Sequence, residues 1–283
     1  IFLASATKEK IISRRVFDIL KNPTIGFVPI LILIFILIGS VIFGYVIVGK
    51  TFAVISFQKG TLVFNLEKNL DKAESYINQS VNFDENDFYY RALTEIYLLR
   101  MNEVLLEQNT NQEEVKSKFW NVYAKSIKFG EKAIEINKNN YQNYVSLGRI
   151  YEAVLPLKIE GVYEKALESY KKAIEYNPNN PGLYLIIARL EATKGDMKKA
   201  RENVLKALAL KSNYTEAIFL LSQIEAQEGN TKLAIQALEA AVYLAPNDVG
   251  LLFQLGLLRY NDKNYKDAIV AFEQAITLNT VYA

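Results

Sequence analysis

The sequence predicts an all-α protein in which a stacked array of helical hairpins follows one membrane-spanning helix. Two observations predict this fold class. A long apolar run without charged residues lies near the start of the chain, and an apolar and small-residue pattern repeats every 34 residues in the second half. A third observation narrows the chemistry: the 283 residues include no Cys and no His.

The apolar run extends from Thr24 to Gly49 without a charged side chain. About 20 apolar residues suffice for a helix to cross the ~30 Å hydrocarbon layer, and a longer run crosses it with some tilt. A cleaved signal peptide is the main alternative. The run is longer than the apolar part of a typical signal peptide, however, and no small-residue cleavage site follows it. We therefore predict a transmembrane helix over residues 24–50.

The charges that flank this run predict its orientation. Residues 1–23 form a basic juxtamembrane segment, whereas only Lys50 and Lys59 follow the run closely. Because positive flanks stay on the cytoplasmic side, we expect residues 1–23 in the cytoplasm and the chain after Lys50 outside it. The reverse topology, with the array facing the cytosol, is the alternative, because Lys50 and Lys59 weaken the charge bias. The cations of the basic segment are Lys8, Lys10, Arg14, Arg15 and Lys21.

The repeats are visible as small residues at a fixed spacing. Ala200, Ala234 and Ala268 are 34 residues apart, and each repeat reads as a helix, a turn such as Lys194-Gly195-Asp196, and a second helix. This pattern resembles the tetratricopeptide repeat (TPR) family, whose unit is a 34-residue helix–turn–helix. The resemblance implies a TPR superhelix, an α-solenoid in which each hairpin buries its apolar face against its neighbours. The family's small first-helix residue falls at Gly148, Ala188, Ser222 and Gly256.

The pattern divides the chain after the span into two parts. Residues 51–140 hold degenerate TPR-like helices with a polar insertion, and residues 141–282 hold four repeats. No turn signal separates the span from the first degenerate helix. Either the membrane helix continues straight into the array, or it breaks near Gly49. The predicted repeats are 141–180, 181–214, 215–248 and 249–282.

The TPR resemblance also implies where a ligand binds. TPR arrays usually hold an extended peptide in the concave groove lined by their first helices, so we expect a protein or peptide partner. Arginines on three neighbouring first helices favour an acidic ligand, because a guanidinium binds a carboxylate through two parallel hydrogen bonds. Val145 and Leu185 stand where a chaperone-type carboxylate clamp has Lys. The alternative for each residue is a solvated or packing role. The candidate groove residues are Arg91, Arg149, Arg189, Phe219, Gln223, Phe253 and Tyr260.

Composition excludes several function classes. Without Cys or His, the chain cannot build a Ser–His–Asp or Cys–His catalytic centre or a zinc site of Cys and His ligands. Its 33 basic and 31 acidic residues give no overall field for nucleic acid. We therefore predict a membrane-anchored scaffold for protein–protein interaction, neither an enzyme nor a nucleic-acid binder, with no cofactor or metal. The oligomeric state stays open.

A second resemblance gives an alternative function. The order of apolar span, basic flank and repeats is similar to the C-terminal part of bacterial O-antigen ligase or polymerase-like membrane proteins that carry TPR repeats. It implies that catalytic residues would lie upstream of Ile1. Richness in Ile, Lys, Asn and Tyr favours a bacterial source, hence the bacterial inner membrane. The chain begins with Ile and ends without a polar capping helix, so we expect further chain on both sides.

Overall fold

The structure is a computed structural model that describes residues 23–106 and 111–278, and every regular element in these ranges is helical. The all-α prediction is confirmed. The elements are α2 (Pro23–Glu67), α3 (Leu70–Phe83), α4 (Asp87–Leu105), α5 (Gln112–Ile136), α6 (Tyr141–Ala153), the 3₁₀ turn η1 (Leu155–Leu157), α7 (Val162–Tyr176), α8 (Pro181–Lys194), α9 (Met197–Leu210), α10 (Thr215–Gln227), α11 (Thr231–Leu244), α12 (Val249–Asn261) and α13 (Tyr265–Leu278).

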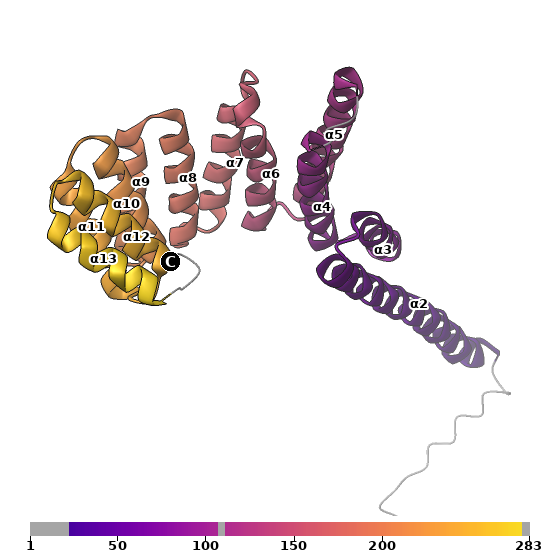
Figure 1. Ribbon diagram of the computed structural model, residues 1–283. Coiled ribbons are helices and arrows are strands. Elements are labelled where there is room, and N and C mark those ends of the chain that lie inside the picture. The colour runs from indigo at the N-terminus through magenta and orange to yellow at the C-terminus, as the bar shows by residue number, and fades with distance from the viewer. Residues whose placement is uncertain (1–22, 107–110, 279–283) are drawn as a thin grey trace, which may run out of the picture.

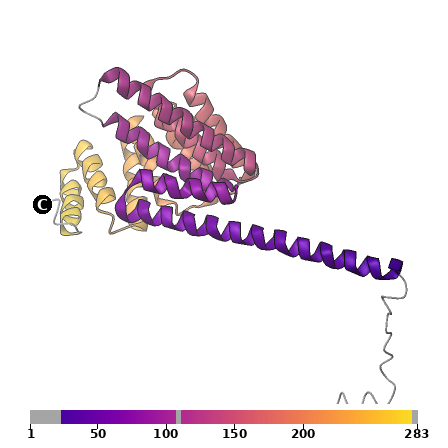
Figure 2. The ribbon, with the colours of Figure 1, turned by 90° about the vertical axis from the view of Figure 1, so that its right-hand side faces the viewer.

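Helix α2 is one uninterrupted helix of 45 residues that passes through Gly49 without a break. At 1.5 Å per residue it is about 67 Å long. Figures 1 and 2 show its N-terminal part extending away from the other helices. Within the described residues it is the one helix long and apolar enough to cross a membrane, and its most apolar window is not buried by other helices. The basic segment expected before it lies outside the described residues.

The C-terminal part of α2 forms the first hairpin of the array. It packs against α3, and Ala53 and Gly60 lie in the contact. A Cβ atom on Gly60 would lie 3.0 Å from Ile77 Cγ1 and 3.1 Å from the carbonyl oxygen of Ala73. A side chain at this position would push its neighbours on α3 away by a few tenths of an ångström, so glycine favours the close approach of the two helices. Of the two alternatives that the sequence left open, the structure has the continuous helix and no break near Gly49.

The remaining helices stack as hairpins in chain order: α4 with α5, α6 with α7, α8 with α9, α10 with α11, and α12 with α13. Figure 1 shows the hairpins side by side in a curved array, with α2 leaving one end and α13 closing the other. Apolar side chains of each hairpin pack against those of the next, so the core continues along the array. This is the packing expected of a solenoid, in which each unit contacts its neighbours.

Asparagines begin several of the first helices. The side chains of Asn86, Asn140 and Asn180 accept hydrogen bonds from the backbone N–H of the second residue of α4, α6 and α8, at 3.0, 3.1 and 2.9 Å. Such a cap satisfies an N–H group that has no partner within the helix. Gly195 (φ 89°) and Gly229 (φ 82°) make the turn between the two helices of their hairpins, in a conformation that favours glycine.

Small residues allow the two helices of a hairpin to approach. Ala166, Ala200 and Ala234 are fully buried, at 0 % exposure. At Gly148 the ring of Tyr170 occupies the space that a side chain would take, because a Cβ there would lie 2.4 Å from Tyr170 Cε1. Close packing of the two helices therefore depends on which positions carry a small side chain or none.

Two irregularities fall where the sequence has polar or proline residues. Helix α6 ends at Ala153, and Pro156 lies in the short turn η1 that follows. The predicted polar insertion at 107–114 falls between α4 and α5, and its last residues begin α5. Residues 107–110 lie outside the described residues. Both features lengthen a hairpin without interrupting the stack.

Candidate functional site

The candidate groove residues are distributed over five successive first helices, α4 to α12. Arg91 lies on α4, Arg149 on α6 and Arg189 on α8. The other candidates lie further along the array: Phe219 and Gln223 on α10, and Phe253 and Tyr260 on α12. The structure brings Arg91 and Arg149 to one pocket and leaves the others separate from it. Leu185 is not in the groove, because its side chain is 2 % exposed and packs in the core of α8, α9 and α10.

The pocket lies between α2, α4 and α6 and has a volume of about 500 Å³; we call it the α2–α4–α6 pocket. Aromatic rings form much of its wall, and the centroids of Phe57 and Phe88 are 4.7 Å apart. Polar groups from α4 and α6 complete it. Its lining residues are Phe57, Thr61, Phe64, Asn65, Ile77, Phe88, Arg91, Ala92, Glu95, Ile96, Gln142, Val145, Ser146 and Arg149. An apolar wall with a few convergent polar groups is typical of ligand sites.

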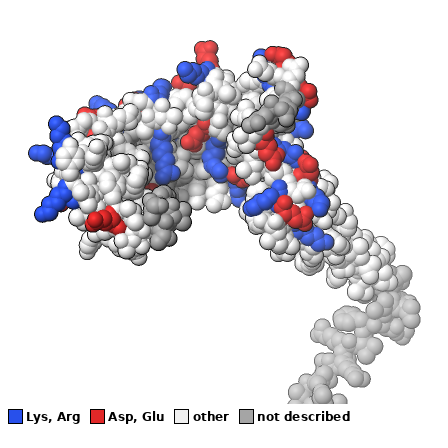
Figure 3. Space-filling view, in the orientation of Figure 1, with Lys and Arg blue, Asp and Glu red and all other residues white. Residues whose placement is uncertain are grey.

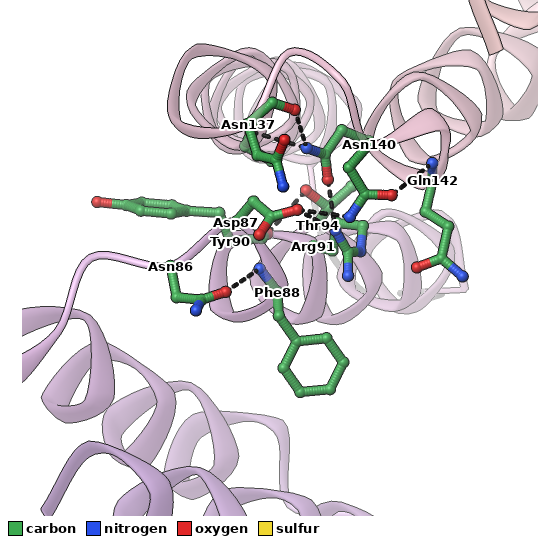
Figure 4. Close-up of polar contacts among 11 residues, drawn as sticks. Asn86, Asp87, Phe88, Tyr90, Arg91, Thr94, Asn137, Asn140 and Gln142 are labelled. Carbon is green, nitrogen blue, oxygen red and sulfur yellow. Dashed lines mark hydrogen bonds and ion pairs between the residues drawn. The ribbon is translucent and has the colours of Figure 1, made fainter. Parts of the chain in front are cut away.

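A buried polar network holds Arg91 in place, as Figure 4 shows. Its Nη1 donates to Asp87 Oδ2 at 2.6 Å and to Asn143 Oδ1 at 2.5 Å. Asn140 Nδ2 donates to the same carboxylate at 2.7 Å, and Asn143 Nδ2 donates to the carbonyl oxygens of Ala133 and Asn137. The network connects α4, the end of α5 and the start of α6. It therefore fixes the guanidinium at the edge of the pocket.

Asp87 is charged within this network. Burial raises the pKa of its carboxyl group, but the hydrogen bonds from Asn140, Arg91 and Asn143 outweigh that effect, so the pKa lies below its usual value. The Asp87–Arg91 pair is largely enclosed, with side chains 11 % and 15 % exposed. A buried pair of this kind is stable only when each partner keeps its hydrogen bonds.

Arg149 also has a carboxylate partner inside the chain. Its Nη1 lies 2.5 Å from Glu95 Oε1, and the two side chains are 51 % and 42 % exposed. Burial within the pocket raises the pKa of Glu95, although Arg149 opposes that rise through its charge and its hydrogen bond. Two of the three candidate arginines are thus paired within the protein. An acidic ligand at this pocket would have to compete with Asp87 and Glu95.

Ser146 carries an unsatisfied polar atom at the pocket. Its side chain lines the pocket, the residue is 4 % exposed, and its hydroxyl oxygen has no hydrogen-bond partner among the described residues. Buried hydroxyl groups nearly always have a hydrogen-bond partner, because a buried hydroxyl without one costs about 1–3 kcal/mol of stability. Because the hydroxyl oxygen is itself enclosed, it is an unpaired group within the wall and not an exposed surface of the pocket.

The remaining candidates lie in more open surroundings. Arg189 is exposed and forms no salt bridge with any residue in the described ranges. Phe219 lines a second pocket of about 510 Å³ between α10 and α12, and Gln223 is exposed one helical turn further along. The rings of Phe253 and Tyr260 are 44 % and 56 % exposed. Phe253 contacts the ring of Phe272 on α13, and Tyr260 contacts the ring of Tyr265 on the same helix.

Sequence reasoning did not identify the α2 side of the pocket. Phe57 and Phe64 are seven residues apart, two helical turns, and therefore share a face of α2. Their spacing indicates one face of a helix, but it directly follows a long apolar run, in which apolar residues occupy every face. Glu95 and Ser146 were also missed, because neither has a local signal. Their importance comes from what α4 and α6 place beside them.

The geometry defines a class of protein: an α-solenoid of antiparallel helical hairpins with a ligand-sized pocket between successive first helices. Sequence models of two repeat families match it, "TPR repeat" over residues 157–188 and "Tetratricopeptide repeat" over residues 215–248 and 249–282. The chain is a tetratricopeptide-repeat protein. Proteins built from these repeats are typically interaction scaffolds rather than enzymes.

Several solved structures are similar to the chain, and one of them, TTC0263, has a TM-score above 0.5. The thermophilic TPR protein TTC0263 of Thermus thermophilus is 19 % identical, with a TM-score of 0.52 over 77 % of this chain and 99 % of that one. MamA is 20 % identical (TM-score 0.48, 66 % of this chain and 92 % of that one). YrrB, described as a TPR protein with an unusual peptide-binding site, is 18 % identical (TM-score 0.46, 72 % and 92 %). No curated protein matches the chain. Neither the repeat models nor these structures support the O-antigen ligase alternative.

Proposed function

We propose that this chain is a membrane-anchored scaffold that holds a segment of a partner protein in the groove of its first helices. Helix α2 anchors it in the bacterial inner membrane, with residues 1–23 cytoplasmic and the array outside. The apolar composition and exposure of α2 support the anchor, and the basic residues before it support the orientation. The protein acts by binding, and no step of catalysis is assigned to it.

The α2–α4–α6 pocket is the observation that carries this proposal. It combines aromatic walls with a guanidinium, that of Arg91, which hydrogen bonds hold in place. Helix α2 contributes Phe57 to Asn65, which follow Gly49 by 8 to 16 residues, or about 12–24 Å along the helix. The pocket therefore opens close to the bilayer that α2 leaves.

The lining predicts a peptide segment with a large apolar side chain. That side chain would occupy the space between Phe57, Phe64 and Phe88, where ring contacts each contribute about 0.5–1.5 kcal/mol. The amides of Asn65 and Gln142 suit the peptide backbone, since a side-chain amide both donates and accepts hydrogen bonds. Because Arg91 and Arg149 already hold carboxylates, this pocket does not require an acidic residue.

The rest of the groove extends the binding surface along the array. Arg189 offers a charge with no carboxylate partner among the described residues, so an acidic residue of the ligand would pair there rather than in the pocket. Phe219, Gln223, Phe253 and Tyr260 would then contact the ligand further from the membrane. One pocket of this size binds a free peptide weakly. A partner tethered in the same membrane has a higher effective concentration and needs less affinity.

Site-specific photo-crosslinking in membranes tests the proposal. A photoreactive amino acid at Thr61, in the pocket, should give a discrete adduct, whereas one at Gln79, on the outward face of α3, should not. Val145→Asp should remove the Thr61 adduct while the helical circular dichroism stays unchanged. Equal adducts from Thr61 and Gln79, or a Thr61 adduct that survives Val145→Asp, would refute the pocket as the binding site.

Topology is tested separately. An enzyme reporter that is active only outside the cytoplasm, fused after Ala283, should be active. An inactive external reporter together with an active cytoplasmic reporter would show the reverse topology. That result would leave the peptide-binding proposal standing but would place its partner in the cytosol.

A further inference from the structure

A row of exposed apolar side chains follows α2 beyond the uncharged run. Alternating steps of three and four residues connect its members, which places them on one face of the helix. The row includes one charged residue, Lys59, which is exposed as well. We call this row the α2 stripe: Phe52 (52 % exposed), Ile55 (41 %), Lys59, Leu62 (58 %) and Leu66 (74 %).

Apart from one contact of Phe52 with α3, the main contacts of α2 within the array use its other faces. Ala53, Ser56 and Gly60 face α3 and are buried, while Phe57 and Phe64 face the α2–α4–α6 pocket. Of the stripe, only the ring of Phe52 has an aromatic partner, at 5.7 Å from that of Phe83. Ile55, Leu62 and Leu66 therefore remain at the surface.

The bilayer does not account for the stripe either. Leu62 and Leu66 follow Gly49 by 13 and 17 residues, which is about 20–26 Å along the helix. The run from Thr24 to Gly49 already exceeds the ~30 Å hydrocarbon thickness. The far end of the stripe therefore stands in water unless another protein surface covers it. Figure 3 shows the uncharged surface of α2 continuing up to the charged side chains of the array.

The neighbouring helix α3 has the mostly polar outer face that is typical of the end of a solenoid. Helix α3 belongs to the same terminal hairpin, and apart from Phe83 at its last residue its outward side chains are polar, among them Asp71, Lys72, Ser75 and Gln79. Terminal units of solenoids need such a polar outer face for solubility. Within one hairpin, α3 meets this requirement and α2 does not. The apolar face of α2 therefore has a use other than closing the stack.

We propose that the α2 stripe is the interface through which two copies of this chain form a parallel dimer. The inference rests on the membrane anchor of the proposed function. Anchoring in one bilayer holds two α2 helices parallel and at the same height, so each stripe meets the same residues of its copy. The spacing fits a two-stranded coiled coil with Phe52, Lys59 and Leu66 at a positions and Ile55 and Leu62 at d positions.

A dimer through this stripe would be small and would contain one charged residue from each copy. A contact of a few side chains falls below the ~1,200 Å² of a standard interface. Confinement of both copies to one membrane raises their effective concentration and makes a small contact sufficient. Lys59 at a single a position costs stability but selects one register and one oligomeric state, as a polar a residue does in coiled coils.

Cysteine cross-linking gives a direct test, because the chain contains no Cys. Leu62→Cys places a thiol on the stripe, and Asn65→Cys places one on the pocket face nearly level with it. Membranes containing each full-length variant are treated with a short bis-maleimide, and dimer is measured on denaturing gels. We expect several-fold more dimer from Leu62→Cys than from Asn65→Cys. Leu66→Cys should behave as Leu62→Cys does.

A second set of variants separates a specific interface from collision in the membrane. Adding Ile55→Glu and Leu66→Glu to Leu62→Cys should reduce the dimer to the level of Asn65→Cys, whereas Lys59→Leu should increase it. Equal dimer from Leu62→Cys and Asn65→Cys would overturn the proposal, as would cross-linking of Leu62→Cys only to a protein of different mass. Extraction of the chain by alkaline carbonate would instead refute the membrane anchor itself. Retention in the membrane without Leu62→Cys dimer would refute the dimer alone.

Discussion

The N-terminal half of the array (α2–α7) and the C-terminal half (α8–α13) reach the same hairpin stack by different means. In the C-terminal half, alanines and glycines at a 34-residue spacing define the contacts, and salt bridges between hairpins are few and partly exposed. In the N-terminal half the spacing is irregular. A buried polar network around Asp87 and close contact at Gly60 hold the helices instead. The difference shows that the hairpin geometry does not depend on one set of residues.

The two halves also differ in the residues that line their pockets. The N-terminal half contains the α2–α4–α6 pocket, where charged groups that are paired within the chain lie beside aromatic rings. The C-terminal half contains a pocket of similar volume at Phe219, but polar and small residues line much of it. Irregularity in the repeat pattern thus coincides with the better-formed site. Regular repeats favour a uniform stack, whereas departures from the pattern place particular side chains.

The largest loss of stability should come from removing Arg91, the arginine of the buried network in the N-terminal half. Arg91→Met leaves the carboxylate of Asp87, a residue 8 % exposed, without its cation. We expect a loss of about 3 kcal/mol in the free energy of unfolding, because a buried charge without its partner is costly. Urea denaturation of the full chain in detergent, followed by circular dichroism, measures it. Asp87→Asn combined with Arg91→Met should cost less than Arg91→Met alone, and an equal cost would contradict this explanation.

Side chains added at equivalent glycines should give the next largest effect. Gly148→Ala forces a Cβ against the ring of Tyr170, which is fully buried and whose hydroxyl is bound to Glu152. We expect a loss of about 1–3 kcal/mol, typical of overpacking. Gly256→Ala meets Phe272, which is partly exposed at the last hairpin and can move, so its cost should be smaller. Thermal unfolding of both variants tests this order. Equal losses would show that the two halves are equally rigid.

Acid should weaken both halves through carboxylates with lowered pKa values. The pKa of Glu225 is lowered mainly by its hydrogen bond from Arg201, and that of Asp87 is lowered because hydrogen bonds outweigh burial. A lowered folded pKa means that the stabilisation is complete above the unfolded pKa, about 4, and is lost as the pH falls through the folded value. Asp87→Asn and Glu225→Gln should each flatten the decline of the unfolding temperature between pH 5 and pH 2. An unchanged slope would contradict the assignment for that residue.

The smallest effect should come from the partly exposed pair of the last two hairpins. Arg259 Nη2 lies 2.7 Å from Glu239 Oε1, and the two side chains are 19 % and 45 % exposed. Pairs near the surface contribute about 0–1 kcal/mol, so Arg259→Met should change stability by no more than that. Urea denaturation beside Arg91→Met gives the comparison. A loss as large as that of Arg91→Met would show that exposure does not separate the two halves.

Several features could be predicted from the sequence and others could not. The 34-residue spacing of Ala200, Ala234 and Ala268 predicted the hairpin stack, because small residues at a helical contact are a local requirement. The α2–α4–α6 pocket could not be predicted, because Phe57, Glu95 and Ser146 belong to three helices whose spacing in sequence is irregular. The candidate groove residues remain a prediction. The structure adds that Arg91 and Arg149 are paired within the chain.

The sequence by itself determined the elements that depend on local periodicity. An apolar run without charge specifies a helix that lipid can surround, and a repeated small residue specifies where two helices can touch. The tertiary structure decided how these elements share surfaces. It placed the end of α2 in the first hairpin, buried Asp87 beside Arg91, left the hydroxyl of Ser146 without a partner and turned Leu62 and Leu66 outward. Each of these depends on which helix lies beside which, and long-range packing sets that arrangement.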